Sequence, residues 1–66
     1  MSFAENIRAI RRSRILSQAN FAKVMGVSAA TINRWESGKS LPNAEGMELL
    51  KEYCELHHLD LDALFE

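Results

Sequence analysis

The sequence predicts an all-α fold, a compact bundle of five short helices. No stretch alternates apolar and polar residues for long enough to form a strand, whereas Phe3, Ile7 and Ile10 follow the spacing of an apolar helical stripe. One signal for the start of a helix also occurs three times: a hydrophobic residue, a capping residue, and a second hydrophobic residue five positions after the first.

The apolar stripe places the first helix over residues 3–13. In each start signal, the capping oxygen can accept hydrogen bonds from free N–H groups of the first turn, while the apolar pair packs together and fixes the direction of the helix. The signals and the helices they begin are Leu16-Ser17 with Phe21 for residues 18–25, Val27-Ser28 with Ile32 for residues 29–37, and Leu59-Asp60 with Leu64 for residues 61–65.

A fourth helix is expected over residues 44–57. It follows Pro42, and Asn43 is its cap, although Gly46 weakens its first turn. The apolar residues of this helix form a stripe wider than one small core needs. They are Met47, Leu49, Leu50, Tyr53, Cys54, Leu56 and His57.

The composition describes one ordinary globular domain that spans residues 1–66. Of the 66 residues, 47% are hydrophobic and 26% are charged. The single cysteine, Cys54, excludes an internal disulfide framework, and no apolar run approaches the roughly 18 residues of a membrane span. We therefore expect a cytoplasmic protein with no membrane partner.

The small net charge of −1 conceals a strong division along the chain. Residues 1–40 carry seven of the eight basic side chains against two acids, a net charge of +5. Residues 41–66 carry Lys51 against seven acids, a net charge of −6. A basic half suits contact with nucleic acid, and an acidic half offers a surface to a protein partner. Charge also segregates by chance in short chains, so this division is supporting evidence only.

The second and third helices are separated only by Gly26, Val27 and Ser28. Glycine can adopt the left-handed conformation that ends one helix and redirects the chain, and Ala22 is small where two crossing helices approach each other. Two short helices joined by such a three-residue turn form a helix-turn-helix, expected here at about residues 17–37. An ordinary helical hairpin is the alternative.

The segment LSQANFAKVMGVSAATINRWESGKSLP resembles the core motif of the Cro/repressor family of helix-turn-helix DNA-binding domains, and LDLDALF resembles the closing helix of that family. The resemblance covers nearly the whole chain. It implies a lambda-repressor-like fold and a small transcriptional regulator of bacteria or phages, with repression as the expected mode. Such a regulator binds double-stranded DNA sequence-specifically, with its third helix in the major groove.

The outer face of the third helix is the candidate for base contacts, because the apolar residues of this helix define its opposite, buried side. Ala29 and Ala30 permit close approach and can contact thymine methyl groups, Asn33 can pair with adenine, and Arg34 can pair with guanine. Two alternatives stay open. Alanine is also the best helix former, and Arg34 could be a solvated surface charge.

Phosphate contacts are expected by resemblance to the family and from local physics. The start of the second helix, at Gln18, offers free N–H groups and the positive end of the helix dipole, which suit an anion. After the third helix, the backbone N–H groups of Gly38, Lys39 and Ser40 form a turn that could hold a second phosphate. The full set of phosphate candidates is Arg12, Arg14, Gln18, Lys23, Ser28, Ser37, Lys39 and Ser40.

The resemblance also implies a structural ion pair between Glu36 and Arg11. Ile15 stands where the family usually has glycine, so the first helix must end differently or accept strain, and His58 likewise replaces a common glycine. Family members often dimerise through the fourth and fifth helices. We therefore expect a homodimer on a pseudo-palindromic operator, with two recognition helices about one DNA turn apart.

Other functions compete with DNA binding. In CELHHLDLD, Cys54 and His58 lie four positions apart, with His57 and Asp62 nearby, a spacing that could hold zinc, but Cys54 falls on the apolar stripe. We expect no metal, cofactor or enzymatic activity, since no nucleophile-base arrangement can be assembled. The main alternative is an adaptor or antitoxin-like protein of the same fold, whose acidic half or Met/Leu stripe binds another protein.

Overall fold

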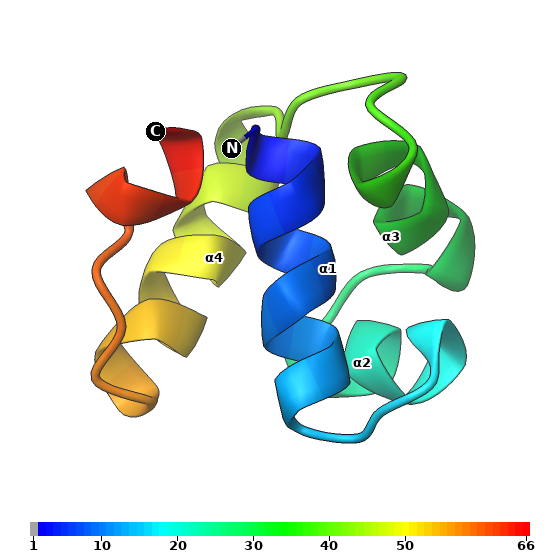
Figure 1. Cartoon of the computed structure of the whole chain (residues 1–66), viewed down its shortest axis with the longest axis horizontal. Helices are drawn as coiled ribbons and strands as arrows, with labels where there is room; N and C mark the ends of the chain where they lie inside the picture. The colour runs from blue at the N-terminus through cyan, green and yellow to red at the C-terminus, as the bar shows by residue number, and fades with distance from the viewer. Residues whose placement is uncertain (1) are drawn as a thin grey trace.

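Four α-helices and one short 3₁₀ helix make up the fold (Figure 1). The computed structural model describes residues 2–66, and no strand occurs among them. The all-α prediction is confirmed, and the first four helices begin and end within one residue of their predicted positions. The elements are α1 (Phe3–Ser13), α2 (Gln18–Met25), α3 (Ala29–Glu36), α4 (Ala44–Leu56) and the 3₁₀ helix η1 (Asp62–Phe65).

The prediction of a fifth α-helix is wrong, because η1 is a 3₁₀ helix of four residues. Asp60 does not cap it: its Oδ1 accepts from the N–H of Asp62, two residues later, at 3.0 Å, which is an Asx turn. No side chain caps η1 at its first flanking residue, Leu61. A segment this short cannot recover the cost of starting an α-helix, so it settles into the tighter 3₁₀ turn.

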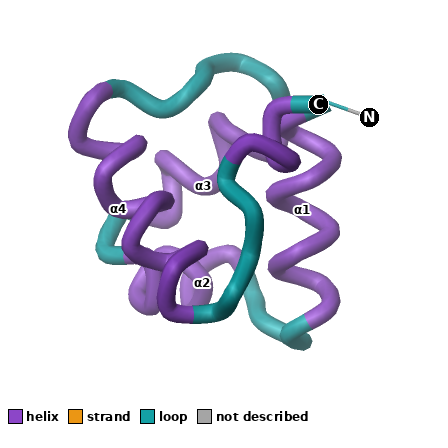
Figure 2. Tube along the Cα trace, turned by 90° about the vertical axis from the view of Figure 1, so that its left-hand side faces the viewer, coloured by secondary structure: helices purple, strands orange, loops and turns teal. Residues whose placement is uncertain are grey.

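In the view of Figure 1, α1 lies at the front, with α2 and α3 to its right and α4 with η1 to its left, and Figure 2 shows α1 along one edge of the molecule. After α4 the chain runs back so that η1 lies beside the start of α1 (Figure 2). Asn6 holds it there by donating from Nδ2 to the carbonyl oxygen of Leu64 at 2.9 Å, and the ring of Phe3 stacks on Phe65 with centroids 4.8 Å apart.

Side-chain caps stabilise the starts of the four α-helices. The caps predicted at Ser17, Ser28 and Asn43 are confirmed, since each accepts a hydrogen bond from a backbone N–H three residues later. A further cap opens α1, where the Oγ of Ser2 accepts from the N–H of Glu5 and the carboxylate of Glu5 accepts from the N–H of Ser2. The S-F-A-E sequence carries this signal, and the prediction from sequence missed it.

The core takes one fully buried side chain from each α-helix: Ile7, Phe21, Ile32 and Leu50. Trp35 extends this core toward α4, and Gly46 is the residue of α4 that lies next to its indole ring. A Cβ at Gly46 would lie 3.0 Å from Cζ2 of Trp35. The glycine that weakens the first turn of α4 therefore makes room for the indole ring.

Ile15 ends α1 in the left-handed conformation, with φ of 57°. The N–H groups of Ile15 and Leu16 donate to the carbonyl oxygens of Arg12 and Arg11, at 3.0 and 3.3 Å. These bonds end the helix in the same way as when a glycine occupies this position. The backbone of Ile15 is strained in this conformation, and its side chain is 93% exposed.

We predict that Ile15→Gly raises the free energy of unfolding by about 0.5–1 kcal/mol. Left-handed geometry costs an L-residue about 1–2 kcal/mol, and the greater freedom of glycine in the unfolded chain offsets only part of this gain. Urea denaturation measures the difference. Ile15→Ala is the control, because it removes the same exposed side chain and keeps the Cβ that causes the strain. Equal stability of the two variants would contradict the prediction.

Candidate nucleic-acid interface

The outer face of α3 is free of the rest of the protein. Ala29, Ala30, Asn33 and Arg34, the four candidates for base contacts, are all exposed. The opposite side of the helix is buried through Ile32, Trp35 and Glu36. The helix is therefore anchored along one side, and its small and hydrogen-bonding side chains lie together on the other.

The turn between α2 and α3 fixes how the two helices cross. Gly26 has φ of 89°, and the N–H groups of Gly26 and Val27 both donate to the carbonyl oxygen of Ala22, at 2.8 and 3.0 Å. Ala22 itself is buried between the helices. A side chain at Gly26 would be strained in this conformation, so the turn requires glycine.

Arg11 and Glu36 form a bidentate ion pair between α1 and the end of α3. The Nε of Arg11 lies 2.7 Å from Oε2 of Glu36, and its Nη2 lies 2.9 Å from Oε1. The remaining Nη1 donates to the carbonyl oxygen of Leu16 at 2.8 Å. The Glu36 side chain is 4% exposed and that of Arg11 is 15% exposed, so the pair is largely shielded from water. The pair therefore ties α3 to both α1 and the segment before α2.

Burial alone would raise the pKa of Glu36, because it disfavours the charged form. The hydrogen bonds from Arg11 and Gln18 outweigh burial, so the pKa of Glu36 lies below its ordinary value of 4.5. The same bond to Glu36 raises the pKa of the Arg11 guanidinium. The two groups thus hold each other in the charged state.

Gln18 connects this buried pair to the exposed face of α3. Its Nε2 donates to Oε1 of Glu36 at 3.2 Å, and its Oε1 accepts from Nδ2 of Asn33 at 3.4 Å. The side-chain amide of Asn33 is therefore oriented by a chain of bonds that begins at Arg11 inside the protein. Orientation of this kind lowers the entropy lost when a polar side chain binds a partner.

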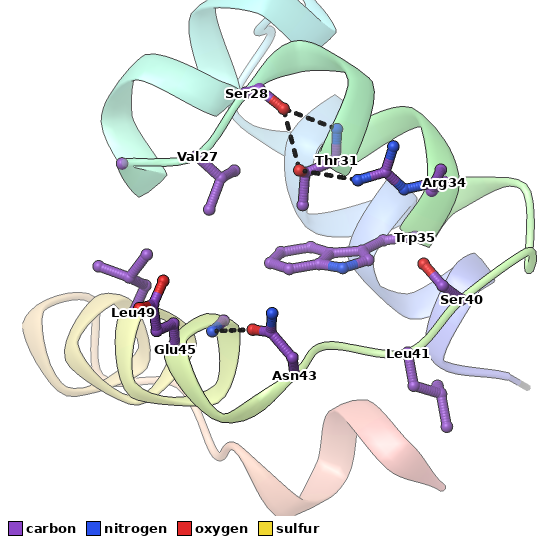
Figure 3. A pocket seen from close by; sticks show the side chains of 12 residues that line it. Val27, Ser28, Thr31, Arg34, Trp35, Ser40, Leu41, Asn43, Glu45 and Leu49 are labelled. Atoms are coloured by element: carbon purple, nitrogen blue, oxygen red, sulfur yellow. Dashed lines mark hydrogen bonds between the residues drawn. The ribbon is translucent and has the colours of Figure 1, made fainter.

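A second chain of hydrogen bonds runs along α3 from Ser28 to Arg34 (Figure 3). The hydroxyl groups of Ser28 and Thr31 lie 2.9 Å apart, and Nη2 of Arg34 donates to Oγ1 of Thr31 at 3.3 Å. Figure 3 also shows Trp35 facing a hollow of about 440 Å³ between α3 and the start of α4. Thr31 was missed in the sequence, although its position one turn before Arg34 predicts such a contact.

The expectation for the turn after α3 is wrong in one respect. The N–H groups of Gly38 and Lys39 donate to the carbonyl oxygens of Trp35 and Arg34, at 3.3 and 3.0 Å, so they are not free for a phosphate. These bonds satisfy carbonyl groups that the end of a helix leaves open. The exposed side chain of Lys39 remains as a cationic candidate.

The other phosphate candidates are spread over the surface. Gln18 and Ser28 lie at the starts of α2 and α3, next to the candidate face. Arg14, in contrast, donates from Nε to the hydroxyl oxygen of Tyr53 at 2.9 Å and is thereby directed toward α4. Lys23 and Ser37 are exposed, and Ser40 is half-buried and lines the hollow of Figure 3.

Two arginines of α1 join the site: Arg12, a phosphate candidate from the sequence, and Arg8, which the prediction from sequence missed. Arg8 and Arg12 line a shallow hollow together with Arg11, Gln18 and Asn33. The Nη2 of Arg8 donates to the backbone carbonyl oxygen of Glu36 at 2.6 Å. Residues three and four apart share one side of a helix, so Arg8 and Arg12 add positive charge beside α3, whereas the charge of Arg11 is paired with that of Glu36.

The residues considered for zinc do not gather into a site. Among residues 2–66, no group of three His, Cys, Asp or Glu side chains is placed to hold a metal ion. Cys54 is buried, and burial, followed by the charge of Asp60, raises the pKa of its thiol. Of the helices described, none has the length and apolar character needed to cross a membrane.

Comparison with known proteins identifies relatives of this chain. A family model described as helix-turn-helix matches residues 7–64. The HTH-type transcriptional activator BcrR of Enterococcus faecalis is 34% identical over 53 residues, which cover 80% of this chain and 26% of BcrR. Antitoxin HigA-2 of Vibrio cholerae is 36% identical over 47 residues, which cover 71% of this chain and 45% of HigA-2.

The fold is shared with a solved structure. The crystal structure of a transcriptional regulator from Listeria innocua matches 97% of this chain and 57% of the regulator, with a TM-score of 0.76 and 26% identity. The chain spans less than half the length of the curated relatives that it matches. Those relatives therefore contain segments with no counterpart here.

We predict that Glu36→Gln lowers the free energy of unfolding by about 3 kcal/mol, because it leaves the shielded guanidinium of Arg11 without its carboxylate. Glu48→Gln makes the same change at an exposed position of α4 and is the control, with an expected effect below about 0.5 kcal/mol. Urea denaturation at neutral pH measures both. A similar small effect of the two changes would contradict the role given to Glu36.

The pH dependence follows from the lowered pKa of Glu36. Since its pKa is lower in the folded state than in the unfolded chain, its stabilisation is complete above about pH 4.5 and is lost as the pH falls through the folded value. Glu5, whose pKa is lowered by hydrogen bonds from Ser2, acts with the same sign. Glu36→Gln should therefore show a shallower loss of stability between pH 5 and pH 2, roughly the range over which such carboxylates are protonated.

Proposed function

The chain belongs to the helix-turn-helix family, and we propose that it is a small transcriptional regulator that binds double-stranded DNA sequence-specifically. One observation carries the proposal: the outer face of α3 is exposed over Ala29, Ala30, Asn33 and Arg34, while the helix is bonded from behind through Glu36. In proteins with this motif, the second helix lies in the major groove with its N-terminal residues at the base edges. A rigid helix with a free polar face suits that task.

The side chains of this face match the chemistry of base edges. The methyl groups of Ala29 and Ala30 can pack against thymine methyl groups, because nothing larger holds the helix away from the bases. Asn33, oriented by Gln18, can donate to and accept from adenine. Arg34 offers two parallel donors to guanine N7 and O6 once it releases Thr31.

The phosphate contacts would set the register of α3 in the groove. The proposal retains all eight candidates from the sequence, among them Arg12, and adds Arg8, which lines the same hollow beside α3. Gln18 begins α2, whose first turn carries the positive end of the helix dipole. Arg14 is the weakest candidate, because Tyr53 already accepts its Nε–H. Lys39 follows α3 on its exposed side.

Two copies would act together. The Cα trace measures 23 × 23 × 22 Å, whereas half-sites one helical turn apart are separated by about 34–36 Å. One copy therefore covers one half-site, and a homodimer covers a pseudo-palindromic operator. The proposed contact uses α4 and η1, where Phe65 is 41% exposed. A dimer seated on an operator would compete with RNA polymerase, so we propose repression, in the cytoplasm where the DNA lies.

A protein-binding adaptor or antitoxin-like role is the second candidate. Antitoxin HigA-2 is among the relatives, and so is antitoxin PezA of Streptococcus pneumoniae, 26% identical over 57 residues that cover 86% of this chain and 36% of PezA. The acidic residues of α4 supply a surface that cannot approach phosphates. This role is compatible with DNA binding, because the exposed residues Glu48, Glu52 and Glu55 of α4 do not line the hollow between α3 and the start of α4.

We predict that the log of the DNA association constant falls with the log of salt concentration with a slope of about −5 to −7, as expected for a dimer that contacts roughly six to eight phosphates.

Arg34→Ala should reduce the binding free energy for the preferred sequence by about 1–3 kcal/mol and relax the preference at one base pair. Lys39→Ala should weaken binding to all sequences alike. Selection from a randomised duplex pool, followed by fluorescence anisotropy, measures these effects.

Lys51→Ala is the matched control for these variants. Lys51 is an exposed cation of α4, so its removal should leave both the affinity and the salt slope unchanged. An adaptor that does not bind DNA would show no salt-dependent binding to any duplex, and that result would overturn the proposed function.

We predict that the spacing of the half-sites controls cooperative binding. Inserting about five base pairs, half a helical turn, rotates one half-site to the opposite side of the duplex. Affinity should then fall to that of a single half-site, and sedimentation should show one copy per duplex at concentrations that load two on the native spacing. Binding that is indifferent to the insertion would contradict a rigid symmetric dimer.

A further inference from the structure

The helix α4 keeps two leucines outside the core, on the flank that faces α2. Leu56 is 74% exposed and Leu49 is half-buried. Across from them, Val24 of α2 is 55% exposed. These three residues line a shallow groove over Met25 and Tyr53, with Glu52 at its edge. We call this surface the α2–α4 groove.

The floor of the α2–α4 groove is made by packed residues. A Cβ at Gly26 would lie 3.6 Å from Cδ2 of Leu49, so Leu49 rests against the turn that joins α2 and α3. Figure 3 shows Leu49 beside Glu45, opposite Val27. Tyr53 is fixed by the hydrogen bond that its hydroxyl oxygen accepts from Arg14 and by the edge-to-face contact of its ring with Phe21. The groove is thus a fixed apolar surface.

The charge along this flank of α4 is negative throughout. At about 100° per residue, Glu45 and Glu52 lie within roughly 60° of Leu49 and Leu56 around the helix, whereas Lys51 lies roughly 140–160° away from both leucines. Glu48 and Glu55 follow on the outer side, and both are exposed. An apolar strip bordered by carboxylates therefore faces outward.

The carboxylates are close enough to repel one another. Glu45 and Glu48, Glu48 and Glu52, and Glu52 and Glu55 are spaced three or four residues apart, and each such like-charge pair destabilises a helix by about 0.2–0.5 kcal/mol. Lys51 lies three residues from Glu48 and four from Glu55 and relieves part of this repulsion, but Glu45 and Glu52 have no lysine or arginine three or four residues away in α4. A cationic partner would relieve it.

We propose that the α2–α4 groove binds a basic amphipathic helix of a partner protein. Helix-in-groove recognition requires apolar side chains on one face of the incoming helix, which would pack against Val24, Leu49 and Leu56. Lysine or arginine residues beside that face would meet Glu45 and Glu52. A second copy of this chain fits this groove poorly, because a two-fold contact here would set Glu45 and Glu52 of each copy against those of the other. The homodimer contact proposed above includes Phe65 of η1, which does not line the groove.

This inference specifies the partner surface of the second candidate function and rests on it. It can be tested apart from DNA binding, because none of the four candidates for base contacts lines the α2–α4 groove. The two can therefore fail separately.

The experiment uses the full chain, uniformly labelled with ¹⁵N, and a synthetic helix of about 18 residues with leucines on one face and lysines on the others. Amide shifts in NMR titration locate the peptide. The expected shifts lie at Val24, Leu49, Glu52 and Leu56. Two further peptides are the controls: one has the same composition in an order that breaks the leucine face, and one carries glutamates in place of the lysines.

Variants then test the groove. Leu56→Lys should weaken the peptide by about tenfold or more, as loss of a central apolar anchor does. Leu41→Lys makes the same change at a leucine that is 68% exposed and outside the groove, and it should leave the affinity unchanged. Glu52→Gln should reduce the affinity at low salt and have less effect at high salt.

Each outcome decides the proposal. Absence of binding at millimolar peptide, equal binding of the scrambled peptide, shifts outside the groove, or equal weakening by Leu56→Lys and Leu41→Lys would overturn it. Affinity for a single half-site, which does not require the dimer, separates the two functions: Leu56→Lys should bind this DNA as the unchanged chain does, and Arg34→Ala should bind the peptide as the unchanged chain does.

Discussion

The carboxylate of Glu36 is the point at which the first three helices are joined. It is the last residue of α3, and it accepts hydrogen bonds from Arg11 of α1 and Gln18 of α2. A shielded ion pair adds little net stability compared with apolar packing, but a shielded charge without its partner is strongly destabilising. Any arrangement of α1, α2 and α3 that separates Glu36 from Arg11 is therefore destabilised.

The same constraint reaches the surface through Gln18. Its side-chain amide contacts Glu36 at one end and Asn33 at the other, so an exposed group of α3 takes its orientation from a buried one. On the far side, Trp35 packs where Gly46 leaves room for it. The helix α3 is thereby supported by three other helices, which a chain of 66 residues can achieve only because each helix gives a fully buried residue to one core.

The parts of the fold that could be predicted are those governed by local rules. Capping oxygens at Ser17, Ser28 and Asn43 act within three residues, so the starts of three helices followed directly from the sequence. The exposed face of α3 followed from its helical period alone. The position of η1 against α1 could not be predicted, because Asn6 and Phe3, more than fifty residues earlier, hold it in place.

Elsewhere, tertiary or terminal geometry overruled a local preference. Ile15 adopts φ of 57° although its β-branched side chain resists it, because the bonds that end α1 are made only in that conformation. The N–H groups of Gly38 and Lys39 were expected to be free, yet the end of α3 uses them. The contact of Arg8 with the carbonyl of Glu36 depends on how α1 and α3 pack, which helical spacing alone does not determine.

A net charge of −1 is compatible with binding to a polyanion because the molecule is larger than the distance over which charge acts in salt. The Debye length at physiological ionic strength is about 8 Å, and the Cα trace is 22–23 Å across. The exposed carboxylates Glu48, Glu52 and Glu55 belong to α4 and, unlike Glu45, do not line the hollow between α4 and α3. When the outer face of α3 meets a duplex, those carboxylates are screened from the phosphates, and the arginines of α1 are not. Binding depends on the charge of the face that meets the partner, and the net charge of the whole molecule matters less. The acidic face of α4 and the basic face beside α3 can therefore bind different partners with little electrostatic coupling between them.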